Sequence, residues 1–487
     1  MKLVEHFFAV LRSLIVGVFS LLQAILGTPS DKHLYSDTPM KWIDKMKLFS
    51  RYGRGLILNG KNRRLSVKNS KVHVAIFGRS GIGKSSVFYQ VNLLSANGKT
   101  YVVTDVDGSL MEQSSGYLKS IGYDIFQINY KDIAQSDLFN SLSFCHTEDD
   151  LRSLSVLTIT SGTTHNNAKD KFWEHSSINL LFLLLKLVKK MPEIYQNFAN
   201  VKHLLTIIEL DEFDEILVKY ADDKLFREFV AYKATEDKLR SNIQASLDAT
   251  LSLMSYSDVA YITSKTTIDI ERLKRPNAIL YVVIPERLLR QYSLSLSILY
   301  GTLFSELQKD KSKHPIYFLL DEAGVYKIDQ LEVLISILRR YNCSLSLAAQ
   351  NFEQWTQLYG PQAAQTIYTN CSTKIIFPGA SLSMSEEISR SSGKKVVETS
   401  INGNVTHQVR PVITPSEIIQ MKKNEILVQH SNYPFTKMRT YPFYKQRKLR
   451  RRSQMKPYLP EPKNVVPPPL ISLDNHNPLI PPTDEQE

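Results

Sequence analysis

The sequence contains very little cysteine. Only Cys145, Cys343 and Cys371 are present among 487 residues, and they lie far apart, with no CxxC pair. Disulfide frameworks and structural zinc sites both need clustered cysteines, so this spacing argues against either. A reducing compartment such as the cytosol therefore suits the bulk of the chain.

Long apolar runs are also scarce, and the one candidate membrane segment lies near the N-terminus. The chain carries no charge between Ser13 and Gly27, but a helix needs roughly 20 apolar residues to cross a bilayer, and extending the segment to Phe7 includes Arg12. An in-plane helix and a spanning helix with a polar stripe both remain open. We expect residues 1–30 to form a membrane-anchoring helix, followed by cytoplasmic chain because Lys and Arg are more frequent after it.

Acidic residues are outnumbered by basic ones, 48 against 60, which gives a net charge of +12 and a pI of about 9.2. A basic balance favours polyanionic partners such as nucleic acid or an anionic membrane surface, but an excess this modest identifies neither. With 43% apolar and 22% charged residues, the chain can bury a sizeable core in two or more packed units.

A glycine-rich motif stands in "KVHVAIFGRSGIGKSSVFYQVNLL", between an apolar run typical of a strand and a stretch of helical periodicity. It satisfies GxxxxGK(S/T), the phosphate-binding P-loop, and this flanking context separates a real P-loop from a chance match. The expected nucleotide-binding residues are Gly78, Arg79, Ser80, Gly81, Ile82, Gly83, Lys84, Ser85 and Ser86. Lys84 would reach the β- and γ-phosphates of ATP, and the Ser85 hydroxyl would ligate Mg²⁺.

An acidic pair follows a second apolar run, in "HPIYFLLDEAG". A P-loop enzyme needs a carboxylate at the end of a neighbouring strand to hold the metal, and Asp321 is placed to do so after the predicted strand Ile316–Leu320. Glu322 could polarise the attacking water, which favours hydrolysis over a nucleotide switch. Most acidic pairs at strand ends are structural, but together with the P-loop this one favours a catalytic site.

Apolar runs alternate with helical stretches along much of the chain, which predicts an α/β fold with a mainly parallel sheet covered on both faces. The further predicted strands are Tyr101–Val106, Tyr123–Asn129, Ala278–Pro285, Ser344–Gln350 and Thr373–Phe377. Between 146 and 272 helical periodicity dominates, which predicts an inserted all-alpha domain between two parts of the nucleotide-binding domain, 31–145 and 273–444.

Residues 445–487 differ in composition from the rest. "KQRKLRRR" carries six cations in eight residues, and nine of the 21 prolines fall in the last 35 residues. This pattern predicts a basic and then proline-rich disordered tail. A solvated charge run and a docking site for DNA or anionic lipid both remain open.

These blocks, taken in order, resemble the type IV coupling proteins, the conjugative DNA-transfer ATPases of the TraG/TraD kind. The resemblance covers nearly all of Tyr52 to Tyr444 and includes "DKFWEHSSINLLFLLL" and "LLDEAGVYKIDQLEVLISILRRYNCSLSLAAQNFEQWTQLYG". The chain departs from the family pattern at Asp107, Ser109 and Ser141. It also has one marginal N-terminal segment where the family commonly has two membrane helices.

The resemblance implies a RecA-like fold, a homo-hexameric ring with a nucleotide at each subunit boundary, and delivery of DNA to a secretion channel. Arg339 would act on the neighbouring subunit's nucleotide and Gln350 would sense the γ-phosphate, although a solvated helix end explains the arginine equally well. The implied partners are DNA, single-stranded and possibly double-stranded, relaxase and relaxosome proteins, channel components and the bacterial inner membrane. A soluble DNA-pumping ATPase and a protein-substrate receptor with a structural ATP site are the alternatives.

Overall fold

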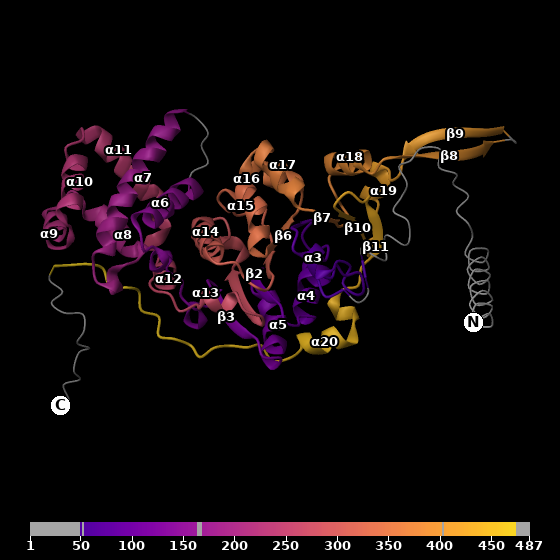
Figure 1. Ribbon diagram of the computed structural model, residues 1–487, viewed down its shortest axis with the longest axis horizontal. Coiled ribbons are helices and arrows are strands. Elements are labelled where there is room, and N and C mark those ends of the chain that lie inside the picture. Colours follow the sequence, from indigo (N-terminus) through magenta and orange to yellow (C-terminus); the bar gives the residue numbers. More distant parts are fainter. Residues whose placement is uncertain (1–48, 51–52, 163–167, 402–403, 474–487) are drawn as a thin grey trace, which may run out of the picture.

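The computed structural model describes residues 49–50, 53–162, 168–401 and 404–473 (Figure 1). The expected membrane-anchoring helix, residues 1–30, lies outside this described part. Within it, no helix is both long and apolar enough to cross a bilayer.

A nine-stranded sheet forms the centre of the molecule. Its strands, in the order in which they pair, are β11 (Thr436–Arg439), β10 (Glu425–His430), β7 (Thr373–Ile376), β1 (Val74–Phe77), β6 (Cys343–Ala349), β5 (Ile316–Leu320), β2 (Thr100–Val106), β4 (Ala278–Ile284) and β3 (Asp124–Asn129). The seven strands from β7 to β3 are parallel, and β10 and β11 add an antiparallel edge. The sheet is therefore mainly parallel, as the alternation of apolar and helical stretches predicted.

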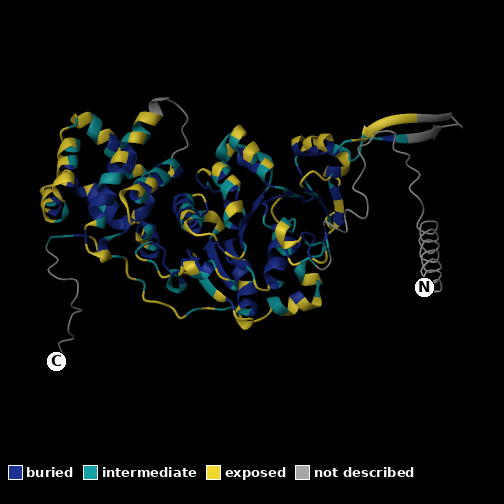
Figure 2. Cartoon of the chain, in the orientation of Figure 1, coloured by how far each residue is buried: buried dark blue, intermediate teal, exposed yellow. Residues whose placement is uncertain are grey.

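The sheet separates two apolar cores because successive strand residues point to opposite faces. On one face Tyr101 and Val103 pack with the helices that follow the P-loop, α4 (Gln90–Leu94) and α5 (Ser109–Ser120). On the other, Val102 joins a larger core that includes α14 (Ser293–Lys309) and α15 (Leu331–Leu338). Figure 2 shows the strands as the buried layer and the exposed residues on the outer sides of the helices.

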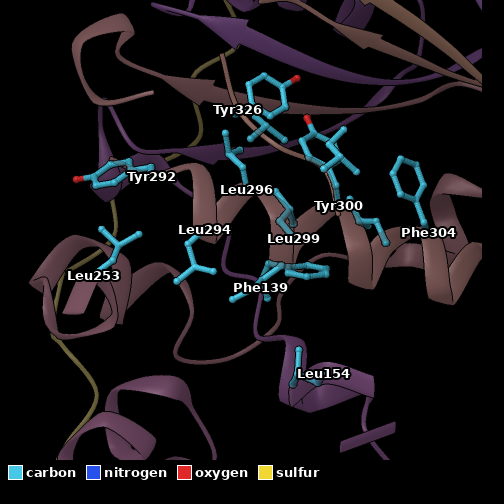
Figure 3. Packing of buried hydrophobic residues seen from close by; sticks show 14 of the residues in the cluster. Phe139, Leu154, Leu253, Tyr292, Leu294, Leu296, Leu299, Tyr300, Phe304 and Tyr326 are labelled. Atoms are coloured by element: carbon cyan, nitrogen blue, oxygen red, sulfur yellow. The ribbon is translucent and has the colours of Figure 1, made fainter. Parts of the chain in front are cut away.

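A group of helices lies beside the sheet, at the left in Figure 1. It comprises α6 (Glu148–Gly162), α7 (Ala168–Lys189), α8 (Phe198–Ile207), α9 (Asp211–Tyr220), α10 (Asp223–Lys233), α11 (Asp237–Leu251), α12 (Ser257–Ile262) and α13 (Ile270–Leu273). The described residues between 148 and 273 contain no strand. Figure 3 shows α14 side chains such as Leu296 and Tyr300 between Tyr326 on one side and Phe139 and Leu154 on the other, so one core is shared by the sheet and the helices.

The remaining elements surround the antiparallel edge and the ends of the sheet. They are α3 (Val67–Ser70), α16 (Phe352–Tyr359), α17 (Pro361–Asn370), α18 (Leu382–Ser391), α19 (Pro415–Ile419), α20 (Arg447–Ser453) and the two-stranded hairpin β8 (Lys394–Ile401) and β9 (Asn404–Pro411). None of the strands predicted from the sequence covers this hairpin, which projects from the right-hand end of the molecule in Figure 1.

The expectation of a disordered tail from residue 445 is wrong for residues 445–473. The basic run forms α20, and residues 454–473 then form an extended strap that runs along the sheet to the helical group (Figure 1). The Tyr458 N–H donates to Ser115 Oγ at 3.0 Å, and the Lys463 N–H to the Ala134 carbonyl at 2.7 Å. Further along, the Asn200 amide pairs with the backbone of the strap, and Ile471 is buried. Side chains of the folded domains thus fix a proline-rich segment that has few donors of its own.

Candidate nucleotide site

The P-loop connects β1 to a helix whose first turn, Ser85–Tyr89, is a π-helix that continues into α4. The Gly78 N–H donates to the Ala349 carbonyl at 3.2 Å, which fixes the start of the loop to β6. A Cβ at Gly78 would lie 2.6 Å from that of Phe377, and Gly83 has a φ of +110°, which side chains rarely adopt. Glycine is therefore needed at both positions to form the loop.

The Lys84 ammonium lies buried under the loop. It donates to the Gly78 carbonyl at 2.7 Å and pairs with Glu322 Oε1 at 3.2 Å. The other oxygen of Glu322 is buried and has no hydrogen-bond partner among the described residues. An unsatisfied carboxylate oxygen beside a P-loop is a suitable acceptor for a water molecule or a ligand proton.

Ser85 and Asp321 meet across the two strand ends. The Ser85 hydroxyl donates to Asp321 Oδ2 at 3.0 Å. Tyr89 supports this approach because its hydroxyl donates to the carbonyl of Leu320 at 3.1 Å, which ties the helix to β5. Burial and the neighbouring Glu322 raise the pKa of Asp321 to about 6. A divalent cation would favour the charged form, and a hydroxyl beside a carboxylate is an oxygen set that Mg²⁺ accepts, so these residues fit the metal.

Asp105 is a site carboxylate that sequence reasoning missed. Thr104 pairs with Leu320 in the sheet, which places Asp105 beside Asp321 at the same edge. Its two oxygens accept the backbone N–H groups of Leu110 and Met111 at 3.0 and 2.7 Å. Burial raises the pKa of Asp105 to about 7, and Asp321 adds to the shift. The signal was present in the sequence, because Asp105 lies near the end of one apolar strand and Asp321 directly follows another.

Gln350 lies directly after β6, the strand between β1 and β5. Its backbone N–H donates to the side chain of Gln354 at 2.8 Å, and its side chain is half-buried. The residue therefore follows the strand that separates the P-loop from the acidic pair, at the same edge of the sheet. This position suits a group that contacts the terminal phosphate of a bound nucleotide.

Arg339 does not join these residues. It lies with Arg340 in a short 3-10 turn, Arg339–Tyr341, which precedes β6, whereas the P-loop and Asp321 follow the ends of their strands. The two edges of the sheet are separated by the length of β6, seven residues or about 23 Å. Both arginines are exposed. Arg339 therefore cannot reach the nucleotide site of its own chain.

Comparison with known proteins shows to which family this chain is similar. The family model described as type IV secretory system conjugative DNA transfer matches residues 41–466. The protein VirD4 of Agrobacterium fabrum is 23% identical over 236 residues, which are 45% of this chain and 35% of VirD4. The match thus spans about a third of the length of that relative.

Solved structures of the coupling protein TrwB share the fold at 16% sequence identity. The form named TrwBdeltaN70, in complex with sulphate, aligns with a TM-score of 0.69 over 85% of this chain and 96% of that one. TrwB in complex with ADP and Mg²⁺ aligns with a TM-score of 0.68 over 85% and 96%. The complex with the ATP analogue ADPNP aligns with a TM-score of 0.68 over 90% and 98%. The chain therefore belongs to the type IV secretory system conjugative DNA transfer family, and it is a type IV coupling protein.

Proposed function

We propose that the protein is a Mg²⁺-dependent ATPase that recruits a relaxase-bound single strand and drives it to a type IV secretion channel. The observation that carries the proposal is the meeting of Lys84 and Ser85 with Asp321 and Glu322 at the ends of β1 and β5. A motor must hydrolyse ATP and therefore needs all four of these residues. Nucleotide binding alone would not require Glu322, a second carboxylate with one oxygen that has no hydrogen-bond partner among the described residues. The TrwB complexes with ADP and Mg²⁺ and with ADPNP support the choice of nucleotide and metal.

Each site residue has a distinct role in this proposal. The loop from Gly78 to Ser86 wraps the phosphates, and Lys84 leaves Glu322 to contact the β- and γ-phosphates. Ser85 and Asp321 hold Mg²⁺, which neutralises charge on the phosphates when it is bound. Glu322 orients and deprotonates the attacking water.

Two residues link hydrolysis to the ring. Gln350 contacts the γ-phosphate and reports its loss. Arg339 acts across a subunit boundary, because its position at the opposite edge of the sheet excludes action on its own nucleotide. The ring is a homo-hexamer in this proposal, anchored at the bacterial inner membrane by residues 1–30, with the catalytic domain in the cytoplasm. Residues 31–145 and 273–444 form the nucleotide-binding domain, and 146–272 the all-alpha domain.

The test is a comparison of Lys84→Ala with a matched surface variant, Lys238→Ala, which removes an exposed lysine from α11. Phosphate release is measured with and without single-stranded DNA, and plasmid transfer is measured between mating cells. We expect Lys84→Ala to abolish both and Lys238→Ala to leave both intact. Transfer that persists without hydrolysis would instead support a receptor for protein substrates with a structural ATP site.

Membrane attachment is tested separately. Deletion of residues 1–30 should move the protein from the membrane fraction to the soluble fraction. A full-length chain that is already in the soluble fraction, and stays there after this deletion, would favour a soluble DNA-pumping ATPase.

A further inference from the structure

A cavity lies at the edge of the sheet opposite the P-loop. Its volume is about 490 Å³, and its lining includes residues just before three strands: Asn97 before β2, Ile121 before β3 and Asn277 before β4. These strands are parallel, and the P-loop follows the end of β1, whereas the cavity lies before the starts of β2, β3 and β4. The length of the strands therefore separates the cavity from the nucleotide site. No role in nucleotide binding accounts for it.

The lining of this cavity is basic. Lys61 and Arg64 come from the segment before α3, and Lys448 and Arg452 come from α20, the helix formed by the basic run near the C-terminus. None of the described residues that line the cavity is a carboxylate. Four cations that share one cavity without a counter-ion repel one another, so a bound anion would reduce this electrostatic repulsion.

Neighbouring groups hold Arg452 in place, and a further lysine, Lys99, lies close to Arg64. The Arg452 guanidinium donates to the Leu94 carbonyl and lies 4.3 Å from the centre of the Tyr117 ring. Lys99 is held behind the cavity by a hydrogen bond of 3.0 Å to the Gly55 carbonyl. Its burial, together with the positive charge of Arg64, lowers the pKa of Lys99 to about 8. The positive charge of Arg452 is therefore held in place and that of Arg64 is partly desolvated, whereas Lys61 and Lys448 are exposed.

The position of the cavity favours a membrane lipid over a nucleic acid. The Arg64 N–H donates to the carbonyl of Ser50, so the chain that carries the N-terminal segment joins the fold at the cavity wall. A polynucleotide would need a row of phosphate contacts, whereas here the cations converge on one cavity with an apolar residue, Ile121, at 38% exposure beside them.

We propose that this cavity binds the phosphate headgroup of an anionic phospholipid and brings the part of this edge beside β2, β4 and β3 to the membrane, apart from Arg339, which precedes β6. The inference rests on the membrane attachment in the proposed function. The exposed cations of α20 that do not line the cavity, Arg450 among them, would add attraction to the lipid surface. Each subunit would then contact the membrane at two places, the N-terminal segment and the cavity.

The test uses the full chain with vesicles of phosphatidylcholine alone or mixed with phosphatidylglycerol. Hydrogen exchange is measured at residues 57–64 and 446–453. We expect exchange at both to slow about tenfold with phosphatidylglycerol only. The double variant Lys61→Glu and Lys448→Glu, which changes two exposed side chains, should lose this protection. The matched control, Lys219→Glu and Lys238→Glu on α9 and α11, should keep it.

Three results would overturn the proposal: equal protection by soluble glycerol phosphate with neutral vesicles, protection by single-stranded DNA in place of lipid, and loss of protection in the control variant. Flotation with the vesicles reports the N-terminal anchor, and hydrogen exchange reports the cavity. A chain that does not float with neutral vesicles but is protected by phosphatidylglycerol would remove the anchor from the proposed function and still support the lipid site.

Discussion

Replacing Glu322 with glutamine should strengthen nucleotide binding and stop hydrolysis. The Lys84 ammonium pairs with Glu322 Oε1 at 3.2 Å, and both side chains are largely buried, at 4% and 15% exposure. A nucleotide must compete with this carboxylate for the ammonium. Removing the competing charged hydrogen bond should contribute about 1 to 2 kcal/mol to binding, which is about five- to thirtyfold in Kd.

The same substitution removes the proposed base, so hydrolysis should fall by about 10² to 10⁴. Binding is measured by titration with a fluorescent ATP analogue, and turnover is measured by phosphate release. Glu332→Gln is the matched control, since it neutralises a carboxylate on α15 that does not contact Lys84, and it should change neither quantity. Weaker binding by Glu322→Gln, or hydrolysis at the rate of the unaltered chain, would refute this reading of the ion pair.

Three further predictions concern the fold that supports the site. Gly116→Ala would place a Cβ 2.0 Å from the Lys456 carbonyl oxygen, so it should lower the free energy of unfolding of the full chain. In a chain that ends at residue 453 this contact is absent, and the substitution should raise the free energy of unfolding by about 1 kcal/mol because alanine favours a helix over glycine. Urea unfolding of both chain lengths, each with glycine and with alanine at residue 116, tests the change of sign. Thr104→Val removes hydrogen bonds to the buried hydroxyls of Tyr300 and Tyr326, at 2.6 and 2.9 Å, and should cost about 1 to 3 kcal/mol by the same assay, whereas Thr104→Ser should cost less. Burial lowers the pKa of His73 to about 4, below the value of 6.5 in an unfolded chain. Between pH 6.5 and pH 4 only the unfolded state gains a proton at this residue, so the free energy of unfolding should fall by about 3 kcal/mol over that range. His73→Gln should remove that part of the pH dependence.

The sequence predicted the chemistry best where it is local. The P-loop is a strand, a loop and a helix start within a few residues, and the strand Ile316–Leu320 before Asp321 has the predicted bounds. The resemblance to the type IV coupling proteins further narrowed the expected function from an ATPase in general to one that takes part in conjugative DNA transfer. Hydrophobic runs marked the parallel strands well because such strands are buried on both faces and carry few polar residues.

Other features depend on contacts between distant segments. Asp105 gains its place from the pairing of β2 with β5, which lies more than two hundred residues further along the chain. The composition of the strap predicts disorder because a proline-rich segment lacks an apolar period of its own, yet Ser115 and Asn200 of the folded domains bind its backbone. In the proposed ring the partner of Arg339 lies on a neighbouring subunit, and no pattern in a single sequence can reveal it.

In the proposed ring, hydrolysis needs two subunits, one that provides Glu322 and a neighbour that provides Arg339. The most direct measurement is the ATPase activity of mixtures of Arg339→Ala and Glu322→Gln proteins in the presence of single-stranded DNA, with assembly checked by sedimentation. Each variant alone should be inactive. In an equal mixture about one quarter of the boundaries would combine an intact base with an intact arginine, so about a quarter of the unaltered activity should return. No recovery at any ratio, with rings assembled, would contradict the account.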